Sequence, residues 1–147
     1  MNMDADKLVI NKVILSDLPR IIEFVVRWLQ DKGLGMYRFA FETAVDEAST
    51  NVMKYAYDGN SGYFEISCSL RNDEVIIKIK DHGKSFDPNS APLPDVKADL
   101  DSRMIGGLGI YMMKKMMDEV SHSYDAGAGN VLTLRKRVHN IKDKASQ

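Results

Sequence analysis

Two strand-like segments separated by a short turn constrain the fold more than any other feature of the sequence. Apolar residues recur at every second position through Tyr63–Leu70 and again through Val75–Lys80. A period of two is typical of strands that bury one face. Between the segments, Asn72 and Asp73 favour a tight hairpin turn. We therefore predict an antiparallel hairpin. The residues expected on its buried face are Phe64, Ile66, Cys68, Leu70, Val75, Ile77 and Ile79.

The other predicted elements flank this hairpin. The further strands are Lys7–Leu15, Val120–Tyr124 and Val131–Val138, the last two joined by the turn Asp125–Gly129. Three helices are predicted. The first is capped by Ser16 or Asp17 and ends at Gly33 and Gly35, and the other two are Met36–Tyr57 and Gly107–Glu119. Helices and strands are partly segregated, which favours an α+β fold over a doubly wound parallel sheet. We expect a two-layer sandwich, a mixed and mainly antiparallel sheet covered on one face by about three helices.

Composition and charge narrow the function classes. With 147 residues the chain suits one domain, residues 1–147, with a core at about 6–138 and a polar tail at 139–147. A net charge of −1 provides no excess of positive charge for a nucleic-acid backbone. The single cysteine, Cys68, excludes an internal disulfide and a cysteine-based metal cluster. Since neither a membrane-length apolar run nor a signal peptide at Met1–Asp6 is present, we expect no membrane partner and a cytoplasmic location.

A carboxylate and an amide interrupt the apolar stripe of the helix predicted at Met36–Tyr57. The stripe consists of Met36, Ala40, Ala44 and Tyr55. Glu47 and Asn51 are four residues apart, so they lie one turn from each other, at the centre of this stripe. A buried carboxylate needs a partner because its desolvation is costly. Two interpretations of Glu47 and Asn51 stay open. They are either a structural pair, on the helix surface or satisfied in the core, or part of a functional site. In a site, Asn51 offers a carbonyl oxygen to Mg2+, and Glu47 deprotonates an attacking hydroxyl or water.

Asp81 continues the buried alternation of the second hairpin strand and is followed by His82 and Gly83. A carboxylate at the inner end of a strand requires a strong hydrogen-bond donor. The exocyclic amine of a purine is one such donor. The alternative is an Asp-x-Gly sequence that only begins a turn.

A glycine cluster, Gly106-Gly107-Leu108-Gly109, opens the third predicted helix. It follows Phe86–Met104, a proline-containing segment with no clear period, and loops of this length are usually functional or disordered. Glycines allow a backbone to approach a ligand closely, and amides at a helix N-terminus suit phosphate. The alternative is a hinge or an ordinary helix start. The phosphate-loop sequence G-x-x-x-x-G-K-[ST] is missing, and the glycines lack dinucleotide-fold spacing.

Taken in order, the three segments resemble the GHKL ATPase superfamily, which includes gyrase B, MutL and the sensor histidine kinases. Glu47-x-x-x-Asn51 matches the N box, and Asp81–Phe86, which reads D-x-G-x-x-F, matches the first glycine box. Gly106–Ile110 matches the second glycine box. The segment between the two glycine boxes lies where the superfamily has its ATP lid.

The resemblance extends to the anti-sigma-factor serine kinases of the RsbW type. It rests on VDEASTNVMKYAY, DHGKSFDP and GGLGIYMMKKMMDEV and covers about residues 6 to 138. Two positions depart from the expected patterns. Lys54 stands where the branch often has His. Gly129-Asn130 stands where the superfamily often has Gly-Thr, with Thr133 as a substitute for the threonine's water-mediated adenine contact. No helical dimerisation segment with a phospho-accepting His is present, unlike in a histidine kinase.

The resemblance implies an ATP- and Mg2+-dependent serine/threonine protein kinase. Its implied partners are a small STAS-type anti-anti-sigma protein and a sigma factor, and it implies a homodimer. By this resemblance, Glu47 would be the catalytic base, Asn51 would hold Mg2+, and Asp81 would recognise adenine. The remaining nucleotide-binding residues it implies are Gly83, Phe86, Gly106, Gly107, Leu108 and Gly109.

Two other functions stay open from the sequence. One is a non-catalytic regulator that binds ATP or ADP and holds or releases a protein target accordingly. The other is an interaction domain without a ligand, which leaves the polar residues on apolar faces unexplained. An intact Glu47 favours catalysis, since a pure binder does not need it.

Overall fold

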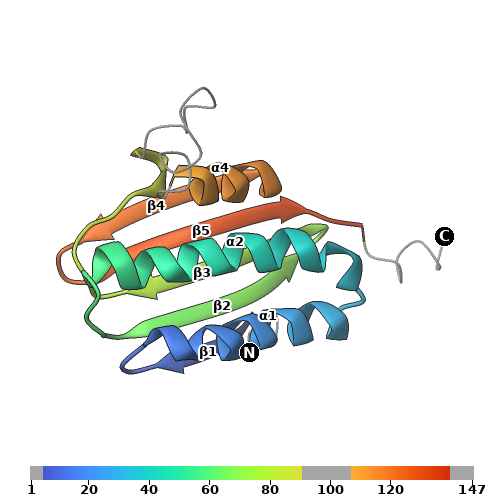
Figure 1. Ribbon diagram of the computed structural model, residues 1–147. Coiled ribbons are helices and arrows are strands. Elements are labelled where there is room, and N and C mark those ends of the chain that lie inside the picture. The colour runs from blue at the N-terminus through green and yellow to red at the C-terminus, as the bar shows by residue number, and fades with distance from the viewer. Residues whose placement is uncertain (1–4, 91–106, 140–147) are drawn as a thin grey trace.

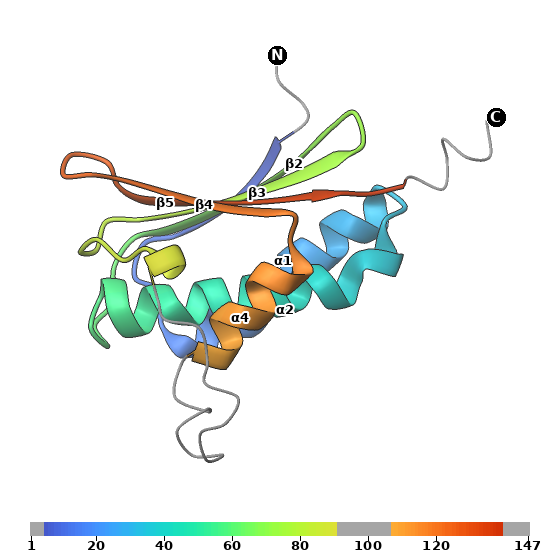
Figure 2. The same ribbon diagram turned by 90° about the horizontal axis from the view of Figure 1, so that it is seen from above.

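A five-stranded antiparallel sheet carries all of its helices on one face, and Figure 2 shows the two layers from the side. The computed structural model describes residues 5–90 and 107–139. The strands are β1 (Ala5–Ile10), β2 (Phe64–Arg71), β3 (Glu74–Asp81), β4 (Glu119–Asp125) and β5 (Gly129–Arg137), in the sheet order β1-β2-β3-β5-β4. The helices of the second layer are α1 (Leu18–Asp31), α2 (Arg38–Asn51) and α4 (Gly107–Met116). The predicted α+β sandwich is confirmed, and all strand pairings described are antiparallel (Figure 1).

The hairpin forms as predicted, and its inner face is the floor of the core. Arg71 pairs with Glu74, so Asn72 and Asp73 make the turn, and Asn72 has the positive φ of 57° that asparagine tolerates. The inward side chains of β2 and β3 are at most 1% exposed, apart from a partly buried Leu70. Asp81 ends this row and is only 3% exposed. The alternation therefore places a carboxyl group in the core layer.

Strand β1 is shorter than predicted. The expected strand Lys7–Leu15 is wrong beyond Ile10, because Ile10 pairs with Phe64 and β2 begins there. The chain then turns, and the backbone N–H of Ile14 donates to the Asp17 carboxylate at 2.9 Å. Such a local bond replaces strand pairing. Leu15–Asp17 forms a 3₁₀ turn that leads into α1.

The long helix predicted at Met36–Tyr57 consists of three parts. A 3₁₀ turn at Gly35–Tyr37 precedes α2, and a π-helical segment, Val52–Ala56, follows it. The Tyr57 N–H donates to the Val52 carbonyl, five residues back, at 3.0 Å. π-Helical turns are rare and occur frequently at functional sites.

The predicted buried stripe of this helix is wrong at its first member, since Met36 is 57% exposed. The apolar residues that α2 buries are Phe41, Ala44, Val45 and Ala48. The stripe is rotated because α2 packs between α1 and α4 as well as on the sheet. As a result Asn51 is buried, whereas Glu47 lies at the edge of the buried face and is partly exposed.

Smaller differences concern the last helix and the segments outside the described residues. The helix predicted at Gly107–Glu119 ends at Met116, and β4 begins at Glu119. Of the predicted loop Phe86–Met104, residues 91–104 lie outside the described residues, as do Gly106 and the tail from residue 140. In the described part, no helix has the length and apolarity to cross a membrane.

Candidate functional site

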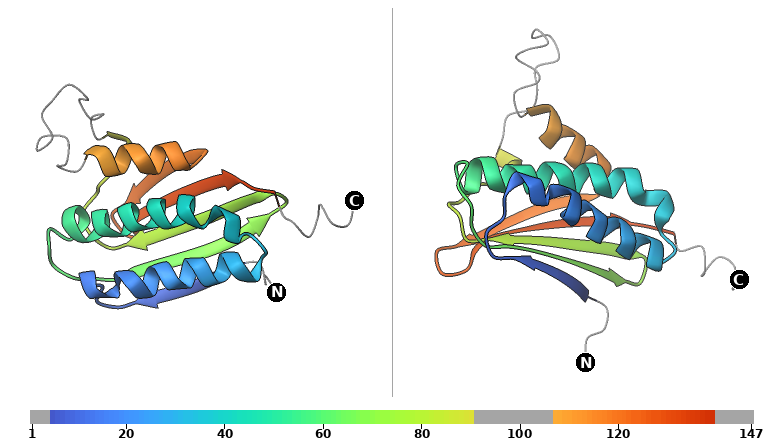
Figure 3. Two further views of the ribbon diagram at one scale, coloured as in Figure 1. Left: turned by 45° about the vertical axis from the view of Figure 1, so that its right-hand side comes forward. Right: turned by 60° about the horizontal axis from the view of Figure 1, so that its bottom comes forward.

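The residues singled out in the three sequence segments meet at one end of the helical layer. Glu47 and Asn51 lie in the last turns of α2, Asp81 ends β3, and Gly109 lies in the first turn of α4. In Figure 3 the end of α2 and the beginning of α4 lie at the same end of the molecule. For Gly107 and Leu108 the structure describes the helical backbone alone, and Gly106 lies outside the described residues.

The carboxylate of Glu47 lies directly against the backbone of Gly109. A Cβ atom added to Gly109 would overlap the carboxylate carbon and both carboxylate oxygens of Glu47. The first turn of a helix has unpaired N–H groups and a partial positive charge. The second glycine box is thus brought into contact with the N box, and glycine is required at this position for the contact.

Burial raises the pKa of the Glu47 carboxyl group above its ordinary value. The Asn51 side chain and the positive charge of Lys54 offset part of this increase, and Asp46 adds to it. A carboxylate with a raised pKa is a better proton acceptor near neutral pH. Glu47 therefore has the environment of a general base.

The Asn51 amide is buried, with 4% of the residue exposed. Its Nδ2 atom makes no hydrogen bond of normal geometry within the described structure, although the side chain is near enough to Glu47 to lower the pKa of its carboxyl group. An unsatisfied buried amide costs about 1–3 kcal/mol. Such a group is typical of a site completed by a ligand.

Asp81 is held by a network centred on Asn130, which faces it across the β3–β5 pair. Asn130 Nδ2 donates to Asp81 Oδ1 and to the Lys84 carbonyl, both at 2.8 Å. Asn130 Oδ1 accepts from the Phe86 N–H at 3.1 Å. Burial raises the pKa of the Asp81 carboxyl group, and the hydrogen bonds from Asn130 and the Gly83 N–H oppose that increase.

Asn130, which stands where the superfamily that the sequence resembles often has threonine, thus fixes the first glycine box over the Asp81 carboxyl group. Thr133 does not replace that threonine. Thr133 pairs with Lys78 and lies three residues after Asn130 on β5. Successive side chains of a strand point to opposite faces of the sheet. The Asn130 side chain faces the helices, so the Thr133 side chain points to the helix-free face. The ring of His122 also contacts Asn130 Oδ1, with Nε2 at 2.7 Å.

Gly83 allows a close approach between its loop and the π-helical segment. A Cβ atom at Gly83 would meet the carbonyl group and side chain of Ala56, and the neighbouring Lys84 N–H donates to that carbonyl at 2.9 Å. The structure therefore explains this glycine by contact with Ala56, in addition to the room for a base that the resemblance implies.

Three aromatic residues that the sequence did not single out support the same loop. The Tyr57 hydroxyl accepts from the His82 N–H at 2.8 Å and donates to the Tyr63 carbonyl. The His82 ring stacks on Tyr63, with ring centres 4.5 Å apart. No single-sequence pattern marks these contacts, because they join residues 6 to 25 positions apart.

A small cavity lies between these groups. Its volume is about 20 Å³, and Asn51, Asp81 and Asn130 are among its lining residues. One water molecule requires roughly 10–15 Å³ by this measure. Phe86, which stacks on Tyr55 with ring centres 4.6 Å apart, and Pro88 also line it.

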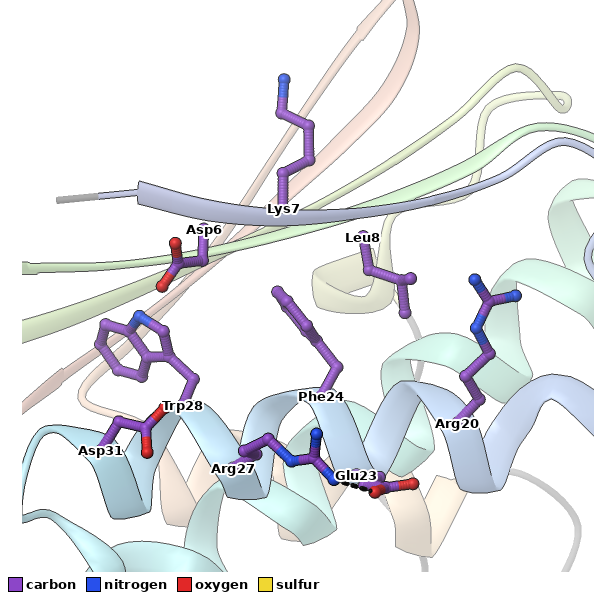
Figure 4. A pocket seen from close by; sticks show the side chains of 9 residues that line it. All are labelled: Asp6, Lys7, Leu8, Arg20, Glu23, Phe24, Arg27, Trp28 and Asp31. Carbon is purple, nitrogen blue, oxygen red and sulfur yellow. Dashed lines mark hydrogen bonds and ion pairs between the residues drawn. The ribbon is translucent and has the colours of Figure 1, made fainter. Parts of the chain in front are cut away.

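A larger groove, of about 460 Å³, lies elsewhere, between β1 and α1. Figure 4 shows Phe24 and Trp28 pointing from α1 toward β1, while Lys7 points away on the other side of the strand. None of the predicted site residues lines this groove. No group of three or more His, Cys, Asp or Glu residues within the described ranges forms a metal-binding cluster.

Comparison with known proteins relates this geometry to one family. Residues 14–136 match the family described as the histidine kinase-like ATPase domain. The serine-protein kinase RsbW of Listeria monocytogenes serovar 1/2a is 34% identical over 107 residues, which cover 69% of this chain and 68% of that protein. The serine-protein kinase RsbW of Bacillus cereus is 30% identical over 104 residues, or 66% and 65% of the two chains.

A solved structure shares the fold. A chain of the SiaB–SiaC complex from Pseudomonas aeruginosa superimposes with a TM-score of 0.58, covering 89% of this chain and 88% of that one. The sequence identity is 14%, so this likeness supports the fold alone.

Proposed function

The chain belongs to the family of histidine kinase-like ATPase domains, within its RsbW-type branch, and from this premise we propose that it is a serine/threonine protein kinase. Its proposed phosphoryl donor is Mg-ATP, and its proposed acceptor is a small STAS-type protein. We further propose that it is an anti-sigma factor, which the acceptor protein antagonises. The sigma factor and the homodimer that the resemblance implies stay predictions.

The observation that carries this proposal is the contact between Glu47 and Gly109. It places a carboxylate of raised pKa against the N-terminal turn of α4, where backbone N–H groups suit a phosphate. A protein that only bound nucleotide would not need a proton acceptor at this point. A general base and an anion site in contact are the parts that phosphoryl transfer to a hydroxyl requires.

The residues present fit Mg2+ and ATP. The Asn51 Nδ2 group is a buried donor without a partner in the described structure, which suits a phosphate oxygen, and the side-chain oxygen of Asn51 is of the hard type that Mg2+ binds. Since the described residues hold no acidic cluster, the phosphates would complete the coordination of Mg2+. Asp81, fixed by Asn130 and Gly83, presents a buried carboxyl group for the amino group of adenine.

The proposed reaction moves one phosphoryl group and one proton. Mg-ATP supplies the γ-phosphoryl group and leaves as Mg-ADP. Glu47 accepts the proton of the acceptor hydroxyl as the new P–O bond forms. Asn51 and the α4 amides position and neutralise charge, which accounts for most of the catalysis in this reaction class.

The test compares phosphate transfer by the wild type, Glu47→Gln and Asp81→Asn to a recombinant STAS-domain protein from the same genome, using radiolabelled ATP. Without its base, Glu47→Gln should transfer about 10²–10⁴-fold more slowly with little change in Mg-ATP affinity. Asp81→Asn should lose about tenfold or more in Mg-ATP affinity, measured by calorimetry. Glu42→Gln is the matched control, because Glu42 lies on the same helix in an exposed ion pair with Arg38.

The outcomes separate the proposal from its alternative. Equal transfer rates for Glu47→Gln and the wild type would remove Glu47 as the base. Tight Mg-ATP binding by the wild type with no transfer to any STAS protein would favour the nucleotide-dependent partner switch. Absence of Mg-ATP binding by the wild type would refute both.

A further inference from the structure

An apolar groove of about 460 Å³ lies beside the end of α2. Its lining includes Ile14, Leu15, Thr50, Met53 and Lys54. Each helical residue turns by about 100°, so Thr50 lies about 60° to one side of Glu47 and Asn51 about 40° to the other. Asn51 lines the small cavity and Thr50 lines the groove. Glu47 is therefore placed between the two.

The groove exposes apolar side chains that packing does not explain. Ile14 is 53% exposed and Leu15 is 66% exposed, both in the short connection before α1. Figures 1 and 3 show the beginning of α1 and the end of α2 at the same end of the helical layer, the end at which α4 begins. Clustered apolar side chains at the surface are typical of an interaction site.

Lys54 gives the groove a positive rim. Its side chain is exposed, and it forms no ion pair with any residue that the structure describes. Its charge nevertheless reaches Glu47, since it lowers the pKa of that carboxyl group. The rim is therefore electrically coupled to the proposed base and complementary to an acidic group.

We propose that this groove binds the acceptor segment of the protein substrate, with an apolar side chain between Ile14 and Leu15 and a carboxylate against Lys54. This inference rests on the proposed function. Along the axis of α2, Thr50 lies about 4.5 Å beyond Glu47, at 1.5 Å per residue, and Lys54 follows in the π-helical segment after α2. An extended segment advances about 3.3 Å per residue. We therefore expect the phosphorylated serine or threonine to lie within a few residues of the carboxylate that contacts Lys54.

The first test measures the KM for the STAS-domain protein with Leu15→Asp. A charge in the apolar groove should raise this KM about tenfold or more, while the Mg-ATP affinity stays within about twofold, because Leu15 does not line the nucleotide cavity. Phe39→Asp is the matched control, since Phe39 is 69% exposed on α2 and does not line the groove. A wild-type KM for Leu15→Asp, or an equal increase for Phe39→Asp, would overturn the inference.

The second test does not depend on catalysis. Leu15→Cys is labelled with a benzophenone maleimide, and Phe39→Cys serves as the control. Labelling is selective because Cys68 is buried and burial raises the pKa of its thiol to about 12. With the STAS-domain protein and Mg-ADP, the label at position 15 should crosslink to the segment that carries the acceptor hydroxyl, and the label at position 39 should not.

The two tests distinguish the inference from the proposed function. Crosslinking at position 15 without any phosphate transfer would support the groove and refute the kinase. Transfer by the wild type without crosslinking at position 15 would support the kinase and refute the groove.

Discussion

Replacing Gly109 with alanine tests the contact between the two halves of the proposed site. The three atoms nearest to the new methyl group would all belong to the Glu47 carboxylate. Because the carboxylate is the far end of a flexible side chain, Glu47 would rotate away, and the backbone would not have to move. Gly109 lies within α4 and has no positive φ, so alanine fits the backbone conformation itself.

The cost in stability is expected to be small. Moving Glu47 off its preferred rotamer costs about 0.5–1.5 kcal/mol. Alanine in place of glycine stabilises a helix by up to about 1 kcal/mol. The two effects nearly cancel, so the free energy of unfolding should change by no more than about 1 kcal/mol.

The cost in activity is expected to be large. A displacement of about 1 Å can lower a rate 10²-fold, and loss of a general base lowers it by about 10²–10⁴-fold. We therefore predict at least a 10²-fold slower phosphate transfer by Gly109→Ala, measured with radiolabelled ATP, beside an unfolding free energy measured in urea. Gly35→Ala is the control, because a methyl group there meets only one atom, at 4.0 Å. Transfer by Gly109→Ala at the rate of this control would refute the reasoning.

Three further changes test other parts of the site. Asn130→Ala removes the side-chain donor of the buried Asp81, so the unfolding free energy in urea should fall by about 1–3 kcal/mol; no change would mean that the network does not stabilise the fold. Tyr57→Phe removes the acceptor of the His82 N–H and should lower both the melting temperature and the Mg-ATP affinity, whereas an unchanged affinity would assign Tyr57 to folding alone. Burial raises the pKa of the Glu47 carboxyl group in the folded state above its value in the unfolded state. The folded wild type therefore loses stability as the pH rises from the ordinary carboxyl pKa through the raised pKa, where the buried group ionises. Glu47→Gln escapes this loss and should be more stable than the wild type at about pH 7.5, with the difference shrinking toward about pH 4 in urea titrations; a constant difference would contradict the raised pKa.

Several features followed from the sequence because they depend on local periods and short motifs. The alternation from Val75 to Ile79 predicted that Asp81 would lie on the buried face, and it does. Asn72 and Asp73 predicted the hairpin turn. The order of the glycine boxes indicated the family that comparison then identified. Each of these signals lies within a few residues of its effect, so no knowledge of distant contacts is needed.

Other features required the tertiary structure, because they depend on what packs against an element. Strand β1 ends at Ile10 because its partner β2 begins opposite it, at Phe64. The buried face of α2 is set by α1, α4 and the sheet together, which leaves Met36 exposed. Asn130 lies 49 residues from Asp81, and only the β3–β5 register brings the two together.

The sequence by itself thus determined the class of fold, the family and the residue types of the site. Only the tertiary structure decided how those residues meet. It showed that the Glu47 carboxylate touches Gly109, that Asn130 holds Asp81, and that Asn51, Asp81 and Asn130 line one small cavity. The physical reason is the range of the interactions. Periodicity and glycine chemistry act within one element, whereas burial, pKa and cavity volume depend on all the elements that surround a group.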